Sequence, residues 1–501
     1  MTAAVTAGSY DVVVVGGGNA GLCAALAARE AGASVLLLER APAEERGGNS
    51  AFTSGAMRVV YGGVDDIRQL VDGLTDEQVA RTDFGTYPAS AFLGDLARVT
   101  DGRTDPDLAA VLVGRSFETL RWMRGHGVGF HALYDRQAFE VGGRFVFWGG
   151  LTVEADGGGR GLVDALTGAS RAAGVAMRYG TRAESLVTAG GRVAGVRASG
   201  DGREETIGAA AVVLASGGFE ANAEWRTRYL GPGWDLAKVR GTRFNTGDGI
   251  RMALDAGAMP WGHWSGSHAV AWDFDAPAYG DRAVGAAFSK LSYPLSIMVN
   301  ARGERFVDEG ADFRNYTYAK YGRRILEQPG QFAWQVFDRK VSRLLRPEYR
   351  TGRVTKVTAG SLDELAGRLD GVDPDGFART VRDYNAAVVD GVPFDPSVRD
   401  GRRTVGLAVD KTNWALALDA PPFEAYRVTC GITFTFGGLR ITTDARVVDQ
   451  AERPIPGLYA CGELVGGLFY FNYPGGSGLT SGAVFGRIAG TSAARFAAVV
   501  A

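Results

Sequence analysis

Short runs of β-branched and aliphatic residues alternate along this chain with glycine-rich turns and with stretches rich in alanine and leucine. Tyr10–Val15 and Ser34–Leu38 are two such runs, typical of strands that are buried on both faces of a parallel sheet. Leu22–Ala31, between them, has the composition of a helix. The pattern predicts a strand–helix–strand unit at the N-terminus, and therefore an α/β fold.

The turn between the first strand and the helix carries the pattern G-x-G-x-x-G at Gly16, Gly18 and Gly21. In this fingerprint the first glycine permits a tight turn, the second admits a pyrophosphate, and the third lets helix and strand pack closely. Glu39 ends the second strand, where an acidic residue can bind ribose hydroxyls. The complete unit predicts a bound dinucleotide, against the alternative of a glycine turn without a ligand.

Further glycine-rich segments favour FAD over a nicotinamide cofactor. Arg46-Gly47-Gly48-Asn49-Ser50 follows the second strand, in a region that runs toward the flavin in flavoproteins of the glutathione-reductase type. A strand from Val212 ends in Ala215-Ser216-Gly217, and Asn245–Gly249 precedes a helix expected over Ile250–Ala256. Ile455–Glu463 leads through Gly466–Gly478 into a last helix, expected over Leu479–Val499.

Composition excludes several classes of protein. The chain has 501 residues, 46% of them hydrophobic, enough for two or three domains. Its 54 basic residues nearly cancel its 56 acidic ones without a basic block, so we expect no nucleic-acid partner. The three cysteines form no CxxC pair, which argues against disulfides and metal sites and favours the cytoplasm. We expect no integral membrane segment, because no apolar run approaches about 18 residues.

Together these motifs resemble the flavoprotein family of fumarate reductase, succinate dehydrogenase and 3-ketosteroid Δ1-dehydrogenase, over nearly the whole chain. Within it, Gly16–Ala31 with the Gly47–Ser50 loop, Arg305–Tyr318 and Phe471–Thr480 resemble the tricarballylate dehydrogenases. The resemblance implies a glutathione-reductase-type, Rossmann-like FAD-binding domain with an inserted α+β cap domain. The FAD-binding domain would comprise residues 1–260 and 430–501, and the cap residues 261–429.

Fingerprint and resemblance together assign residues to FAD. They are Gly16, Gly18, Asn19, Ala20, Gly21, Glu39, Arg40, Gly47, Gly48, Asn49, Ser50, Ala215, Ser216, Gly217, Asn245, Thr246, Asp248, Gly462, Glu463, Ser477, Gly478 and Leu479. Some members of the family attach FAD to a histidine after the second strand. Residues 49–54 contain none, so we expect non-covalent FAD.

The family oxidises a CH–CH bond next to a carboxylate or carbonyl, or runs the reverse reduction. The resemblance implies a dehydrogenase of a small-molecule substrate, a polycarboxylate such as tricarballylate, that passes electrons to an external acceptor: a quinone, a protein or oxygen. The alternatives are a desaturase of a ketosteroid or biosynthetic intermediate, a fumarate-type reductase, and a flavin-binding subunit without turnover.

Arg314 and Tyr473 are the first candidates for the chemistry. Arg314 could clamp a carboxylate or form an ion pair with Asp308 or Asp312; by counting, the arginine acid of fumarate reductases falls on Phe313. Tyr473 lies in Tyr-Pro-Gly, as in the ketosteroid enzymes, and could polarise a carbonyl or pack beside the flavin.

The other candidates would bind substrate. His268 and His263 lie at the start of the expected cap, where a family histidine binds a carboxylate, although a buried structural histidine is an alternative. Thr433 and Phe434 stand where fumarate reductases carry a second histidine, which weakens a fumarate interpretation. Arg243 and Gly476 are the remaining candidates for substrate binding. Arg240, three residues before Arg243, could also contact substrate, although a solvent-exposed position is the alternative for both arginines. Residues 64–159 show helical patterns without identifiable chemistry.

Overall fold

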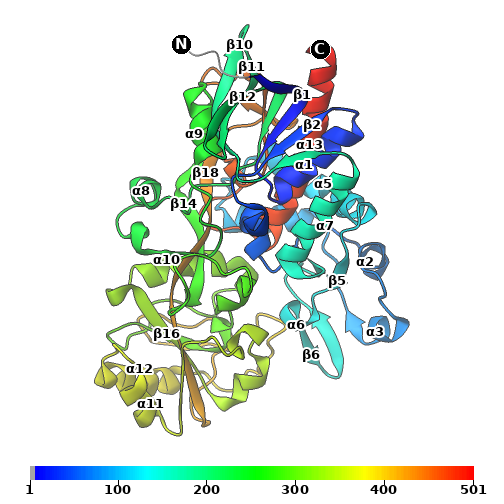
Figure 1. The fold of residues 1–501 in the computed structure, drawn as a ribbon. Coiled ribbons are helices and arrows are strands. Elements are labelled where there is room, and N and C mark those ends of the chain that lie inside the picture. Colours follow the sequence, from blue (N-terminus) through cyan, green and yellow to red (C-terminus); the bar gives the residue numbers. More distant parts are fainter. Residues whose placement is uncertain (1–5, 501) are drawn as a thin grey trace.

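The computed structural model describes residues 6–500, and its first layer is a mainly parallel sheet (Figure 1). β1 (Thr6–Val15) lies between β2 (Val35–Leu38) and β12 (Arg203–Leu214), parallel to both. Val12, Val13 and Val14 are fully buried, as their β-branched run predicts. The other strands of this eight-stranded sheet are β9 (Ala176–Arg178), β10 (Arg182–Ala189), β11 (Arg192–Gly200), β19 (Arg446–Val448) and β20 (Pro454–Ala460).

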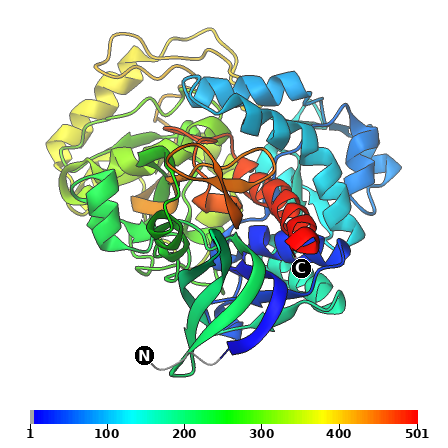
Figure 2. The same cartoon turned by 90° about the horizontal axis from the view of Figure 1, so that it is seen from above.

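Two helices whose sequences are almost 450 residues apart pack against each other beside this sheet. They are α1 (Asn19–Glu30) and α13 (Ser477–Val500), both predicted from the sequence within a few residues. A Cβ atom on Gly486 would lie 2.4 Å from the carbonyl oxygen of Ala20, and one on Gly490 would lie 2.0 Å from that of Ala24. The glycines therefore permit a helix contact that no larger residue allows. Figure 2 shows α13, in red, running from the centre of the molecule out to the C-terminus.

A second, six-stranded sheet is built on two long antiparallel strands, β14 (Pro260–Asp273) and β18 (Phe423–Leu439). Both run from the first sheet into a second lobe, seen in the lower part of Figure 1. The lobe also contains β15 (Ile297–Val299), β16 (Phe332–Phe337), β17 (Lys356–Ala359), α10 (Tyr318–Leu326), α11 (Leu362–Arg368) and α12 (Pro374–Ala387), while β13 (Lys238–Val239) pairs with β18. β18 continues without a break through residue 429, so the domain division at that point stays a prediction.

Residues 56–172 pack against the first layer as helices of 4 to 20 residues and small sheets. The helices are α2 (Val64–Leu70), α3 (Asp76–Ala80), α4 (Ala89–Val99), α5 (Pro106–Gly125), α6 (Tyr134–Gln137) and α7 (Gly158–Ala172). The strands are β3 (Ala56–Met57), β4 (Thr82–Asp83), β5 (Phe130–Ala132), β6 (Ala138–Val141), β7 (Arg144–Phe147) and β8 (Val153–Ala155). Elsewhere, α8 (Ala223–Trp225) is a short helix, and α9 (Asp248–Asp255) is the helix expected after Asn245–Gly249.

α13 has the length and the mean hydropathy, 1.2, that a membrane-crossing helix needs. Half of its most apolar window is buried inside the protein, however, and its glycines contact α1. These contacts are those of a core helix, and no other helix among residues 6–500 meets the same length and hydropathy.

The α1–α13 contact is testable by adding a single methyl group. We expect Gly486→Ala to lower the free energy of unfolding by about 1–3 kcal/mol, because the new Cβ meets backbone that cannot move aside. The matched control is Gly168→Ala on α7, where no atom lies within 4 Å, and the gain in helix propensity there should raise stability by about 0.5–1 kcal/mol. Urea unfolding of both variants measures the difference. Equal stabilities would contradict the close contact.

Candidate active site

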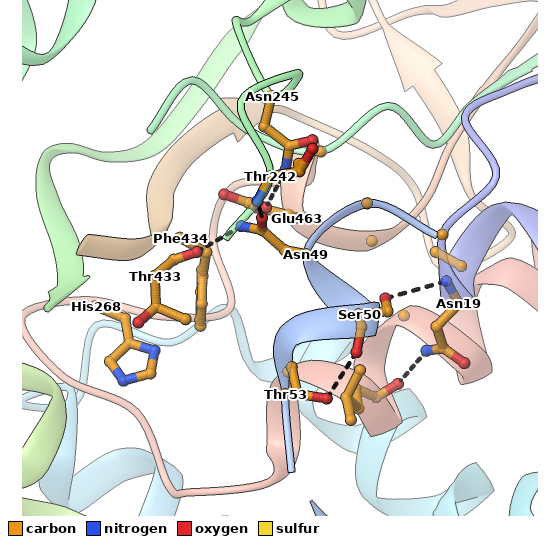
Figure 3. A pocket seen from close by; sticks show the side chains of 18 of the residues that line it. Asn19, Asn49, Ser50, Thr53, Thr242, Asn245, His268, Thr433, Phe434 and Glu463 are labelled. Atoms are coloured by element: carbon orange, nitrogen blue, oxygen red, sulfur yellow. Dashed lines mark hydrogen bonds between the residues drawn. The ribbon is translucent and has the colours of Figure 1, made fainter. Parts of the chain in front are cut away.

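One continuous cavity extends from the β1–α1 turn to the second lobe. Its empty space, the open solvent at its mouth included, is about 1940 Å³, and its lining extends from Gly16 and Asn19 at the start of α1 to Arg314, Tyr318 and Arg346. The lining thus offers contacts for a large cofactor at one end and for a substrate at the other. Figure 3 shows the residues that line its middle part, from Asn19 and Ser50 at one side to His268 at the other.

The three fingerprint glycines have different physical reasons to be glycine. Gly16 has φ +110°, and a Cβ there would lie 2.4 Å from the carbonyl oxygen of Ala215; one on Gly21 would lie 1.9 Å from that of Gly16. A Cβ on Gly18 would meet no protein atom closer than 3.5 Å. Protein packing thus demands glycine at 16 and 21, whereas at Gly18 the space is left for a ligand that approaches the start of α1.

Glu39 and a group of arginines form the end of the cavity nearest β2. The Glu39 carboxylate accepts hydrogen bonds from the backbone N–H groups of Gly17 and Ala41, both at 2.8 Å. Arg182 binds Asp248 with two hydrogen bonds, of 2.8 and 2.9 Å, and Arg40 reaches the same carboxylate at 3.1 Å. These contacts hold Glu39 and Arg40 at the edge of the cavity, where ribose hydroxyls and phosphates could bind them.

The N-termini of α1 and α13 meet at the cavity. Nδ2 of Asn19 donates to the carbonyl oxygen of Leu479 over 2.8 Å, and the Asn19 backbone N–H donates to Ser50 Oγ over 3.1 Å (Figure 3). Gly18, the N-cap of α1, contributes no side-chain cap. Two positive helix ends, one of them uncapped, therefore face the same space, an arrangement that favours anionic groups.

Two buried carboxyl groups, Glu220 and Glu463, lie beside the middle of the cavity. Nδ2 of Asn245 donates to Glu220 Oε1 over 2.7 Å and to Glu463 Oε2 over 3.4 Å, and Asn49 donates to Glu220 Oε1 over 2.5 Å. Burial raises the pKa of both carboxyls, and the neighbouring Glu220 raises that of Glu463 further. The environment therefore favours the protonated form of these carboxyls over that of a free glutamic acid, and a protonated member of the pair could donate as well as accept a hydrogen bond.

All but four of the residues assigned to FAD line this cavity. The exceptions are Gly21, which packs on Gly16; Gly47, whose Cβ would meet Val163; Thr246, whose hydroxyl accepts from Arg40 over 2.6 Å; and Ser477, whose hydroxyl donates to the carbonyl of Pro474. These four support the cavity wall. The buried Ser216 hydroxyl, a lining group, has no hydrogen-bond partner in the protein, which fits a site completed by a ligand.

His268 reaches the opposite end of the cavity because the pairing of β14 with β18 slips twice. The register shifts between His263 and Ser267, and again between His268 and Ala269. Such bulges re-aim side chains next to active sites. Neither ring nitrogen of His268 has a hydrogen-bond partner, although the residue is 1% exposed. Burial, and then the charge of Arg240, lower the pKa of this imidazole well below its usual value, so it is neutral at pH 7.

Tyr473 packs beside His268 and forms a hydroxyl–hydroxyl hydrogen bond with Tyr318, the first residue of α10. The ring of Phe434 lies against both His268 and Tyr473, with centroids 5.3 and 5.1 Å apart. Burial raises the pKa of both tyrosines, so both hydroxyls are protonated at neutral pH. The pair can donate a proton to a bound group or orient it.

Two guanidinium groups in this end of the cavity, those of Arg240 and Arg314, have no acidic partner among residues 6–500. Each residue is 9% exposed. The ion pair with Asp308 or Asp312, the alternative role of Arg314, does not form: Asp312 pairs with Arg98, and Asp308 accepts from Thr412 over 2.8 Å. Burial lowers the pKa of both arginines, but a guanidinium still stays charged, so the site holds net positive charge.

Two predicted substrate residues lie outside the cavity. Arg243 is exposed and forms an ion pair with Glu45 at 2.6 Å, and its guanidinium lies 4.9 Å from the centroid of the Phe244 ring. His263 accepts a hydrogen bond from the Phe471 N–H over 3.0 Å. Both expectations need correction, because the loop after β13 turns Arg240 inward instead of Arg243, and the bulge in β14 separates His263 from His268.

Thr433, Phe434 and Gly476 do line the cavity. The Thr433 hydroxyl is buried without a partner, while its carbonyl oxygen accepts from Asn49 over 2.6 Å. Gly476 has φ +84°, and a Cβ there would lie 2.5 Å from Leu151 Cδ1, so its glycine is needed for packing.

Several residues that line the cavity carry no recognisable signal in the sequence. Arg136 and Gln137 end α6, in the stretch where no chemistry was identified, and Arg346 with Glu348 come from the second lobe. Burial raises the pKa of the Glu348 carboxyl, but the charges of Arg346 and Arg136 outweigh it and lower the pKa to about 2. No local motif marks these residues, since only the fold brings them together.

Comparisons with known proteins agree with this geometry. Residues 11–479 match the FAD binding domain family. The chain is 30% identical over 500 residues to a probable fumarate reductase of Shewanella frigidimarina, covering 99% of this chain and 77% of that protein. It is 27% identical over 583 residues to 3-oxosteroid 1-dehydrogenase of Mycolicibacterium smegmatis, covering 99% of each.

Among solved structures, the open conformation of a flavocytochrome c3 fumarate reductase superposes with a TM-score of 0.72 at 29% identity, covering 98% of this chain and 79% of that one. The fold is thus the mixed α/β fold of FAD-binding flavoproteins. The chain belongs to the FAD-binding flavoprotein family of the fumarate reductases and 3-ketosteroid dehydrogenases, and it is an FAD-dependent oxidoreductase that acts on CH–CH groups.

Proposed function

We propose that this enzyme interconverts a CH–CH bond and a C=C bond next to a carboxylate of a small organic acid. One observation carries the proposal: Arg240 and Arg314 are buried in the cavity without an acidic partner among residues 6–500. An uncompensated buried charge costs several kcal/mol, and a substrate carboxylate would offset that cost. Two guanidinium groups, which bind carboxylates in planar, charge-assisted hydrogen bonds, suit this ligand.

FAD would lie with its pyrophosphate at Gly18 and the start of α1, its ribose at Glu39, and its flavin toward the N-terminus of α13. When bound, FAD supplies the hydride chemistry at the flavin ring. The positive end of α13, at Gly478 and Leu479, would stabilise negative charge on the reduced flavin. Among residues 6–500, His268 is the only histidine that lines the cavity, and it lies at the substrate end, so we propose that FAD is held without a covalent bond.

The residues around His268 would handle the proton and the developing enolate charge. Tyr318 and Tyr473 share a hydroxyl hydrogen bond, and either phenol can donate a proton to the carbon next to the carboxylate in the reductive direction. In the dehydrogenation direction the tyrosinate form of one of them would have to accept that proton. Arg240 and Arg314 would stabilise the negative charge that develops on the carboxylate oxygens. Neutral His268, with two unpartnered ring nitrogens, can donate one further hydrogen bond to the substrate.

A tricarboxylic acid such as tricarballylate would engage several of these arginines at once, which supports a polycarboxylate substrate. The direction of dehydrogenation is proposed from the resemblance of Arg305–Tyr318 and Phe471–Thr480 to the tricarballylate dehydrogenases. A larger carbonyl compound is the alternative, supported by the aromatic wall of Phe434 and Tyr473 and by the likeness to a steroid dehydrogenase. In either direction the electrons require an external partner. The three cysteines are free and buried, which supports the expected cytoplasmic location.

The proposal is tested by mixing the anaerobic holoenzyme with organic acids and following the flavin band. We expect tricarballylate or succinate to bleach the oxidised form, or fumarate or acrylate to reoxidise the reduced form. Arg240→Met should raise the half-saturating acid concentration about 10–100-fold, because a charge-assisted hydrogen bond of about 1.5–3 kcal/mol is lost.

Arg243→Met is the matched control, since it removes an exposed arginine three residues away, and it should leave that concentration within about twofold. A response to a 3-ketosteroid alone would favour the larger carbonyl substrate. If no acid and no ketone changes the flavin spectrum, the proposed function is wrong.

The pH dependence follows from the buried groups. We expect kcat/KM for the reduction of an unsaturated acid to be level between about pH 7 and 9, because His268 stays neutral and Tyr318 and Tyr473 stay protonated and able to donate across this range. The lowered histidine pKa places its protonation below the range, and the raised tyrosine pKa values place their ionisation above it. Stopped-flow flavin kinetics measure the profile, and an inflection near pH 7 that His268→Asn removes would contradict this assignment.

A further inference from the structure

A second, smaller cavity lies next to the substrate end of the first one, and we call it the outer chamber. Its wall contains Phe139, Trp148, Leu295, Phe313 and Trp414. The side chains of Arg136, Arg314 and Arg346 border both spaces. Leu291 also lines both spaces, so the outer chamber and the substrate end of the first cavity share these four residues.

The aromatic side chains of the outer chamber form a row of contacting rings from three distant parts of the chain, of which the first two pairs are stacked and the last is tilted. The ring centroids of Phe139 and Trp148 are 6.0 Å apart, those of Trp148 and Phe313 are 4.9 Å apart, and those of Phe313 and Trp414 are 5.6 Å apart. Phe139 and Trp148 come from the β6–β7 hairpin, which stands beside the second lobe in Figure 1. The wall is thus assembled only in the folded protein.

Trp414 is held in place at a cost in backbone strain. Its φ is +56°, a conformation that costs a bulky residue about 1–3 kcal/mol. Its indole N–H donates to the carbonyl oxygens of Asp395 and Val398, at 3.0 and 2.9 Å, and its backbone N–H donates to Asp400 over 2.9 Å. Strain of this kind accumulates at sites that clamp ligands.

Polar groups at the border of the outer chamber lack partners. Nη1 of Arg346 and Nε1 of Trp148 are buried donors without a hydrogen bond, although the residues are 9% and 7% exposed. Arg314 lies with its guanidinium 5.3 Å from the Trp148 ring centroid. Such donors, next to stacked rings, match a ligand that has a flat apolar body and an acidic or carbonyl group at the arginine border.

We infer that the outer chamber binds an aromatic or alicyclic extension of the substrate, so that the enzyme also accepts acids larger than succinate, fumarate or tricarballylate and prefers them to short acids. The carboxylate end would bind Arg240 and Arg314, and the apolar body would pass Arg136 and Arg346 to contact the wall that Phe139, Trp148, Leu295 and Phe313 form. This inference rests on the proposed function, since it names the substrate class of the same site.

The test compares a short and an extended acid on the reduced holoenzyme: acrylate, and cinnamate, which adds a phenyl ring. We expect cinnamate to have a KM at least about 10-fold below that of acrylate. Trp148→Ala should raise the KM of cinnamate at least about 10-fold more than the KM of acrylate. Leu295→Trp, which fills the chamber, should act in the same direction. Trp122→Ala, which removes a tryptophan on α5 outside both cavities, should leave the ratio of the two KM values unchanged.

The inference would be overturned if the Trp148 and Leu295 variants changed the KM values of cinnamate and acrylate by the same factor, or changed neither of them. The failure of the proposed function looks different, because then neither acid reoxidises the flavin. In that case equilibrium dialysis of 3-phenylpropionate against propionate decides on the chamber alone. Tighter binding of the phenyl acid, abolished by Leu295→Trp, supports the chamber, and equal binding overturns it.

Discussion

The contact between α1 and α13 is the constraint on which the rest of the site depends. Gly486 and Gly490 let α13 lie against the backbone of Ala20 and Ala24, and the bond from Asn19 to Leu479 joins the two N-termini. The first loop of the chain and its last helix thereby face one cavity. A small shift between these helices would separate Gly18 from Gly478, and with them the two ends of the cofactor site. Glycines thus shape the binding site in two ways: Gly486 and Gly490 allow close helix packing, and Gly16 allows the tight turn before α1.

Charge dominates the other end of the cavity. Arg240 and Arg314 are buried without acidic partners, whereas Arg346 is paired with Glu348 at 2.9 Å. The neighbouring titratable groups, His268, Tyr318 and Tyr473, are all neutral at pH 7 and cannot compensate. The folded protein therefore carries an electrostatic cost that a bound anion relieves, which explains why a carboxylate substrate is the natural occupant.

The cofactor half of the site could be predicted from the sequence, and the substrate half only in part. Gly16, Gly18 and Glu39 lie in a short motif whose geometry is local, so its spacing located them, whereas the assignment of Asn49 needed the resemblance of its loop to known flavoproteins; all four line the cavity. Arg136, Arg240 and Arg346 come from separate lobes, and no periodicity signals their meeting. The course of one loop decides that Arg240 and not Arg243 points into the cavity, and a bulge in β14 decides that His268 does so. A local sequence pattern does not specify where such a side chain points, because tertiary contacts set its orientation.

The most direct test of the account measures whether the cavity recognises a carboxylate as an anion. Malonate and its neutral diamide have similar shapes, and neither has a bond that the enzyme could desaturate. Each is titrated into the oxidised holoenzyme, and the shift of the flavin absorption band is recorded. The account predicts that malonate shifts the band at concentrations at least about 100-fold below those of the diamide, because only the anion compensates Arg240 and Arg314. Equal binding of the two compounds would contradict it.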